Sequence, residues 1–104
     1  MSPVPFVLPE PTREEVDALP GSILLEFGIN ECPHCQLVQP LVADTLRRHP
    51  EVKHLRIEDG KGRRLGRSFA VKIWPALIFM KDGHEGARVL RPTTQADVDA
   101  LFKR

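Results

Sequence analysis

The chain has two cysteines, Cys32 and Cys35, and they are separated only by Pro33 and His34. Two thiols at this spacing can exchange a disulfide with another molecule, or they can supply two ligands of a zinc site. The loop that a bond between them would close is too short to restrain the unfolded chain much. The pair is therefore expected to serve reactivity rather than stability.

Two predicted elements flank the cysteines and would position them. The segment 22–28 is apolar except at Glu26, which is typical of a central strand buried on both faces. From Pro33 to Arg48, apolar residues recur at three- and four-residue steps, which predicts an amphipathic helix. Pro40 lies inside this helix, so we expect either a kink there or two helices that abut.

The start of this helix would give the two thiols different roles. If the helix begins near Cys32, Pro33 occupies its first position, where a missing N–H is harmless. Cys32 then lies at the N-cap, where free N–H groups and the helix dipole favour a thiolate, and a protonated His34 would add to that effect. Cys35, one turn further along and more shielded, would resolve the mixed disulfide formed at Cys32. Stabilising the reduced thiolate in this way makes the pair a better oxidant.

The cysteine pair has two other interpretations. A closed zinc site needs four ligands, but there is no second CxxC, and the histidines are scattered at His34, His49, His54 and His84. We therefore expect no metal and no cofactor. A buried and inert pair is also possible, but a position between a strand and a helix favours reactivity.

The remaining patterns predict one α/β domain over residues 1–104. The opening segment, 1–11, is a proline-rich extended arm with 6–8 as its only strand candidate. Further elements are a short helix capped by Thr12, strands at 52–57 and 76–80, a weak helix at 61–69, a hairpin strand at 87–90, and a last helix capped by Thr94. Strands that alternate with helices, followed by a hairpin, predict a mixed sheet with helices on both faces.

Composition limits the classes of partner. The net charge is +1 and both signs are interspersed, which argues against nucleic acid or an acidic membrane as the main partner. The first nine residues lack the pattern of a secretory signal, and no later apolar run has membrane-spanning length. We expect a soluble, cytoplasmic monomer. In that compartment a lone CxxC is more often catalytic or metal-binding than structural.

From about Val16 to Phe102 the sequence resembles the thioredoxin superfamily. The resemblance is carried, in order, by the apolar strand 24–27, the CPHC motif at 32–35, Pro40, Trp74-Pro75 and the turn 81–83. It implies a thioredoxin fold and a thiol-disulfide oxidoreductase that acts on disulfide-containing proteins and is recycled by a thioredoxin-reductase-type enzyme. By the same resemblance, Cys32 is the nucleophile, Cys35 is the resolving thiol, and Pro75 is a cis-proline that faces the pair and helps bind the substrate backbone.

Three positions depart from the pattern of that superfamily. Glu26 falls where a buried aspartate is usual. It is either desolvated, and then able to take the proton of Cys35, or it reaches solvent on its longer stem. Glu31 replaces the usual tryptophan before the first cysteine, and its charge opposes the effect of His34. Leu90 stands near the usual glycine of the substrate-facing rim, so the docking groove is expected to be narrower.

Two further features each have two interpretations. Trp74 is either a core aromatic residue or a bulky lip of the substrate groove. A basic cluster either attracts acidic partners or forms a solvated helix face; its members are Lys61, Arg63, Arg64 and Arg67. The altered rim at Glu31, Trp74 and Leu90 also supports a rival hypothesis, a non-catalytic thioredoxin-fold binding or chaperone-like module.

Overall fold

The computed structural model describes residues 4–103. Its strands form one mixed sheet in the order β2-β1-β3-β4. The strands are β1 (Ser22–Gly28), β2 (Lys53–Glu58), β3 (Ala76–Lys81) and β4 (His84–Leu90). Strand β1 runs parallel to β2 and antiparallel to β3, and β3 and β4 form an antiparallel hairpin. The sheet is therefore mixed, as predicted.

The helices are α1 (Arg13–Asp17), α2 (Pro33–Arg47), α3 (Leu65–Ser68) and α4 (Gln95–Asp99), and a 3₁₀ turn, η1 (Ala100–Phe102), follows α4. Capping boxes begin both α1 and α4: the side chains of Thr12 and Thr94 each accept a hydrogen bond from the N–H three residues on. The two caps predicted from the sequence are thus confirmed.

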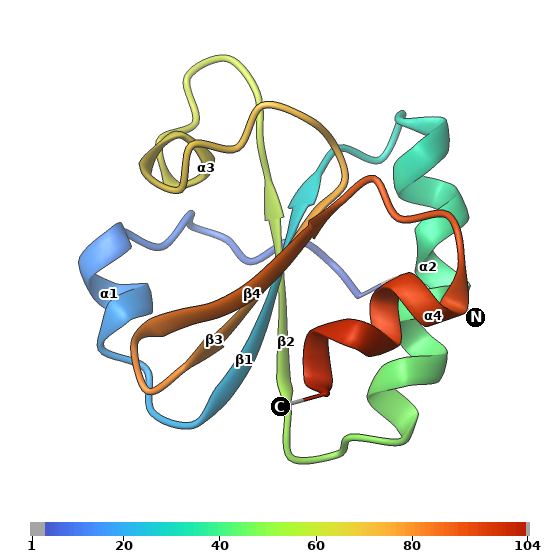
Figure 1. The fold of residues 1–104 in the computed structure, drawn as a ribbon. Coiled ribbons are helices and arrows are strands. Elements are labelled where there is room, and N and C mark those ends of the chain that lie inside the picture. Colours follow the sequence, from blue (N-terminus) through green and yellow to red (C-terminus); the bar gives the residue numbers. More distant parts are fainter. Residues whose placement is uncertain (1–3, 104) are drawn as a thin grey trace.

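Helices cover both faces of the sheet (Figure 1), so the predicted α/β architecture is confirmed. One face packs against α1 and α3, which contribute Val16 and Leu65 to a core that includes Phe27 and Ile78. The other face packs against α2, α4 and η1; this second core contains Leu24, Val38, Val42, Leu77, Phe79, Val98 and Leu101. Because both faces are buried, β1 and β3 have near-continuous apolar sequences.

Helix α2 is a single helix that contains Pro40, so the alternative of two abutting helices is wrong. The proline is exposed. Its missing N–H therefore leaves a gap in the helical hydrogen bonding on the side that water can reach. No helix in residues 4–103 is both long enough and apolar enough to cross a membrane.

Three predicted elements differ from the structure. The arm makes only an isolated bridge, Phe6 to Arg56, in place of a strand at 6–8, because the prolines around it cannot donate to a ladder. The weak helix predicted at 61–69 is reduced to α3, because Gly60 and Gly62 adopt positive φ of 124° and 83° and hold the start of this segment in turns. Strand β4 also begins earlier than predicted, at His84.

The strand register brings several loops to one end of the sheet. At this end Gly28 pairs with Glu58, Phe27 with Ala76, and Ala76 with Leu90. The loops after β1 and β2 and the loop before β3 consequently emerge together, as Figure 1 shows. Cys32 and Trp74-Pro75 lie in these loops, so this end of the sheet carries the candidate site.

Candidate active site

Cys32 is the N-cap residue of α2, as predicted. Its backbone is extended, with φ of −79° and ψ of 118°, and Pro33 occupies the first turn. The Cys32 Sγ accepts a hydrogen bond of 3.2 Å from the backbone N–H of Cys35. The sulfur thus has an N–H donor and lies at the positive end of the helix dipole.

Cys35 lies one turn further into α2 and is 1% exposed, whereas Cys32 is partly exposed. The pKa of the Cys35 thiol is raised to about 12, first by burial and then by the hydrogen bond with Cys32 and the negative charges of Cys32 and Glu26. Gly28 allows the sulfur to sit so deep, because a Cβ at that residue would lie 2.6 Å from the Cys35 Sγ. The structure therefore contains one accessible sulfur and one shielded thiol.

Glu26 is buried on the α2 side of the sheet, with 2% of its surface exposed. The alternative in which its longer stem reaches solvent is therefore wrong. His54 Nε2 lies 2.8 Å from Oε1, and Arg56 Nε lies 3.3 Å from Oε2. Gln39 also donates to Oε2. A buried carboxylate with this many donors around it is compensated in charge and in hydrogen bonds.

Arg56 is the main source of that compensation. Its side chain is 4% exposed, and it donates to the Val4 carbonyl at 2.7 Å and to Asn30 Oδ1 at 3.2 Å. The guanidinium also lies over the ring of Phe6, 4.4 Å from its centroid. The N-terminal arm and the loop after β1 therefore hold Arg56 beside Glu26.

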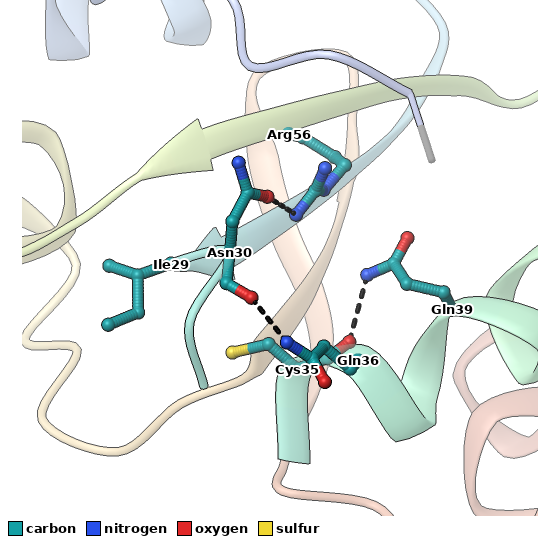
Figure 2. Close-up of a pocket in the computed structure, with 6 residues that line it drawn as sticks. All are labelled: Ile29, Asn30, Cys35, Gln36, Gln39 and Arg56. Carbon is teal, nitrogen blue, oxygen red and sulfur yellow. Dashed lines mark hydrogen bonds between the residues drawn. The ribbon is translucent and has the colours of Figure 1, made fainter. Parts of the chain in front are cut away.

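A cavity of about 230 Å³ lies between this cluster and Cys35. Figure 2 shows its lining residues: Ile29, Asn30, Cys35, Gln36, Gln39 and Arg56. The Gln39 amide spans the gap, because it donates to the Cys35 carbonyl at 3.0 Å as well as to Glu26. The resolving thiol thus borders the same cavity as Gln39 and Arg56, the two partners of the buried carboxylate.

The Trp74–Pro75 peptide bond is cis, as the superfamily resemblance implied. Pro75 directly precedes Ala76, which pairs with Phe27, so the register brings it next to Gly28 and the loop that leads to the cysteines. Trp74 is partly buried, and its indole N–H donates to Asp59 Oδ2 at 2.8 Å. Trp74 is therefore fixed at the end of the sheet that carries Cys32.

Comparison with known proteins bears on this arrangement. A family model described as Thioredoxin matches residues 7–104. The chain belongs to the thioredoxin family.

Individual thioredoxins show the extent of the similarity. The structure of thioredoxin 2 from Pseudomonas aeruginosa PAO1 in its reduced form is 49% identical, with a TM-score of 0.84 over 94% of this chain and 91% of that one. Thioredoxin H3 of Arabidopsis thaliana is 30% identical over 61 residues, which is 59% of this chain and 52% of that protein. A thioredoxin of Chlamydia trachomatis is 29% identical over 80% of this chain and 78% of its own length. The match thus spans only about half the length of the plant relative.

The rim beside Pro75 includes Leu90 and the residue after it, Arg91. Leu90 is the last residue of β4 and is 45% exposed. The next residue, Arg91, has a left-handed backbone conformation, with φ of 50°. Arg91 donates its backbone N–H to the Pro75 carbonyl at 2.8 Å and its side-chain Nε–H to the Trp74 carbonyl at 2.9 Å. Arg91 therefore contributes to the rim, whereas a role of Leu90 in substrate binding stays a prediction.

His34 and Glu31 are both exposed beside Cys32. Neither is brought into the buried cluster, so any influence on Cys32 acts through solvent-exposed charge. Among residues 4–103 there is no group of three His, Cys, Asp or Glu side chains that could hold a metal ion. The described part of the site therefore consists of thiols and their polar neighbours.

Sequence reasoning did not single out five residues of this site: Gln39, His54, Arg56, Asp59 and Arg91. One signal could have found two of them. In a strand, alternate residues share a face, so His54 and Arg56 face the same side, and a parallel partner strand could carry Glu26 beside them. The observed register does pair Glu26 with Arg56. No comparable pattern marks Asp59 or Arg91, because their contacts depend on loop conformation.

Proposed function

We propose that this chain is a thiol-disulfide oxidoreductase that exchanges electrons with disulfide-containing proteins. The observation that carries the proposal is the asymmetry of the dithiol: the Cys32 sulfur is accessible and lies at a helix N-cap, whereas Cys35 is buried one turn below. A nucleophile needs access and thiolate character, and a resolving thiol needs only to reach its neighbour. The 49% identity to a Pseudomonas aeruginosa thioredoxin supports the same activity.

The reaction would proceed in two exchanges. The Cys32 thiolate attacks one sulfur of the substrate disulfide, the S–S bond breaks, and one substrate thiolate leaves with the bonding electrons. Cys35 then loses its proton and attacks Cys32 Sγ, which releases the second substrate thiolate and forms the Cys32–Cys35 disulfide. The substrate is reduced by two electrons and the protein is oxidised by two. A thioredoxin-reductase-type enzyme would restore the dithiol.

Glu26 is proposed to accept the proton of Cys35 in the second exchange. With a pKa of about 12, Cys35 remains a thiol at neutral pH and needs a base before it can attack. Glu26 is the carboxylate whose charge acts on this thiol, and its partner Gln39 lines the cavity beside the sulfur. A water in that cavity could carry the proton from Cys35 towards Oε2.

The rim would bind the substrate backbone beside Cys32. Pro75 lies next to the loop that leads to the dithiol, and Trp74 and Leu90 flank it. The CPHC sequence would tune the potential, because a protonated His34 stabilises the reduced thiolate while Glu31 opposes it. The same proposal includes a single domain over residues 1–104 that acts as a monomer. It also includes a cytoplasmic location, which favours net reduction of the substrate.

Reduction of a model disulfide protein with dithiothreitol as the electron source tests the proposed activity. Catalysis should be present in the parent protein and absent in Cys32→Ser. Cys35→Ser should instead accumulate a mixed disulfide at Cys32, since the first exchange is intact and the second is blocked. Full catalysis in Cys32→Ser would rule the proposal out.

The rival, a non-catalytic binding module, makes a different prediction. Such a protein would not be recycled by a thioredoxin-reductase-type enzyme, and it would bind a specific partner equally well without either cysteine. The exposed apolar residues Leu37 and Ile73, at 70% and 44%, are the surface that would favour it. Partner binding should therefore be measured in the Cys32→Ser/Cys35→Ser variant.

A further inference from the structure

The basic cluster singled out in the sequence lies at the same end of the sheet as the dithiol. The backbone N–H of Asp59 donates to the carbonyl of Gly28, which ties the loop after β2 to the strand that leads to Cys32. Figure 1 shows this loop and α3 beside the loop that enters β3, which contains Trp74. A protein that docks at Cys32 would therefore meet this basic surface as well.

Within the described residues, the carboxylates at this surface are already engaged by the fold. Glu58 pairs with Arg63 at 2.6 Å, and Asp59 accepts from the Trp74 indole. Glu10 accepts the backbone N–H groups of Arg64 and Leu65 at the start of α3. Each of these acids therefore has at least one polar partner within the chain.

Apart from Arg63, the cations of the same surface have no carboxylate partner within the described part of the fold. In the range 4–103, the exposed side chains of Lys61, Arg64, Arg67 and Lys72 have no carboxylate partner within 4.0 Å. A cavity of about 430 Å³ adjoins two of them, Arg67 and Lys72; its other lining residues are Asp59, Gly60, Arg63, Ala70 and Val71. It is large enough to admit a carboxylate side chain, and its lining carries three basic side chains, Arg63, Arg67 and Lys72, against the one acidic side chain of Asp59.

We propose that this cavity, which we call the α3 basic pocket, binds an acidic side chain of the protein substrate near its reacting disulfide. The occupant is fixed by charge complementarity, because Arg67 and Lys72 offer unneutralised positive charge. Glu31, exposed directly before Cys32, repels acidic groups there. Acidic substrate residues are thereby directed towards α3, which orients the substrate on the rim. This inference rests on the proposed activity and adds a substrate preference to it.

Matched peptide disulfides test the pocket. One set carries two Glu residues before the reacting cysteine, another carries them after it, and a third has Gln at both places. At low ionic strength, kcat/KM should be roughly fivefold higher for one of the acidic sets than for the Gln set, as expected for two partly exposed charge contacts. The preference should shrink as salt is added.

Two double variants with the same change in charge locate the effect. Arg67→Gln/Lys72→Gln should abolish the preference for acidic peptides and leave the rate with the Gln peptide unchanged. Lys53→Gln/Lys81→Gln removes two exposed cations at the opposite end of the sheet and should keep the preference. Thermal unfolding of both variants verifies that they are folded.

Three results would overturn the proposed role of the pocket. They are equal rates of the parent with all peptides, a preference for acidic peptides that survives Arg67→Gln/Lys72→Gln, or a preference that both double variants lose equally. Failure of the proposed activity gives a different result. In that case the parent would not reduce the Gln peptide, and Cys32→Ser would not differ from it.

Discussion

Replacement of Arg56 by methionine tests whether Glu26 depends on a buried positive charge. The two residues are 3% and 2% exposed, and Arg56 Nε lies 3.3 Å from Glu26 Oε2. Removal of one partner of a buried ion pair leaves the other charge uncompensated and typically costs about 3 to 5 kcal/mol. His54 and Gln39 still bond to Glu26 in the variant. We therefore expect Arg56→Met to destabilise the protein by about 3 kcal/mol, at the lower end of that range.

A second variant separates charge from packing. Glu26→Gln/Arg56→Met removes both charges, so no buried ion is left without a partner. It still loses the hydrogen bonds of Arg56 to Val4 and Asn30, each worth about 1 kcal/mol. The double variant should nevertheless be more stable than Arg56→Met by about 1 kcal/mol. In the single variant the buried Glu26 charge has lost its partner, and the change to Gln removes that charge.

Urea unfolding of the reduced proteins measures these differences. Trp74 is the only tryptophan of the chain, so its fluorescence reports one region, and circular dichroism provides an independent probe. With a slope of about 1.5 kcal/mol/M, a loss of about 3 kcal/mol lowers the midpoint by about 2 M. Arg88→Met serves as the control. Arg88 pairs with Glu85 at the surface, where such pairs contribute about 1 kcal/mol or less.

Two results would refute this reasoning. The first is an Arg56→Met variant that loses no more stability than Arg88→Met, which would mean that Glu26 does not need the guanidinium. The second is a double variant less stable than Arg56→Met, since the buried charge would then not be the source of the cost. A changed slope in urea would instead indicate an altered unfolded or native state, and calorimetry would then replace the extrapolation.

Three further predictions follow from the site. Gly28→Ala should cost about 1 to 3 kcal/mol in urea unfolding, because its Cβ would lie 2.6 Å from the Cys35 sulfur, whereas Gly86→Ala, with 3.5 Å of clearance, should be near neutral. The pKa of Cys35 is raised from 9.0 to about 12, so its contribution to the free energy of unfolding should be complete below pH 9 and be lost as the pH rises towards 12. A Cys35→Ser variant whose stability has the same pH dependence would contradict this. His34→Pro should lower the reduction potential, by roughly 30 mV for each pKa unit of lost thiolate stabilisation, and an unchanged glutathione titration would remove His34 from the mechanism.

Features that depend on local pattern were predictable from the sequence. The N-cap at Cys32, the caps at Thr12 and Thr94, and the buried strands β1 and β3 all follow from residue types at short spacing. The limits of α3 were not predictable from the sequence, because the start of a four-residue helix is set by the turns at Gly60 and Gly62 rather than by periodicity.

Contacts between residues far apart in the sequence could not be predicted without the structure. The partners of Glu26 come from β2 and α2, and the register of the parallel strands, which pairs Glu26 with Arg56, is not encoded locally. The contact of Arg91 with the Trp74 carbonyl needs a positive φ at an arginine, a conformation that its residue type does not favour. The resemblance to thioredoxins led us to consider Leu90, one residue away.

The two sulfurs act on each other, but the other charges around them differ. Cys32 lies near the exposed side chains of His34 and Glu31, and salt screens charges at the surface strongly. Cys35 is influenced by Glu26, which lies with Arg56 and His54 in a buried cluster where screening is weak. Added salt should therefore change the attack by Cys32 far more than the resolution by Cys35. Because Arg56 pairs with Glu26 from the neighbouring strand, substitutions at 33–34 can alter the first exchange while leaving the Glu26–Arg56 pair in place.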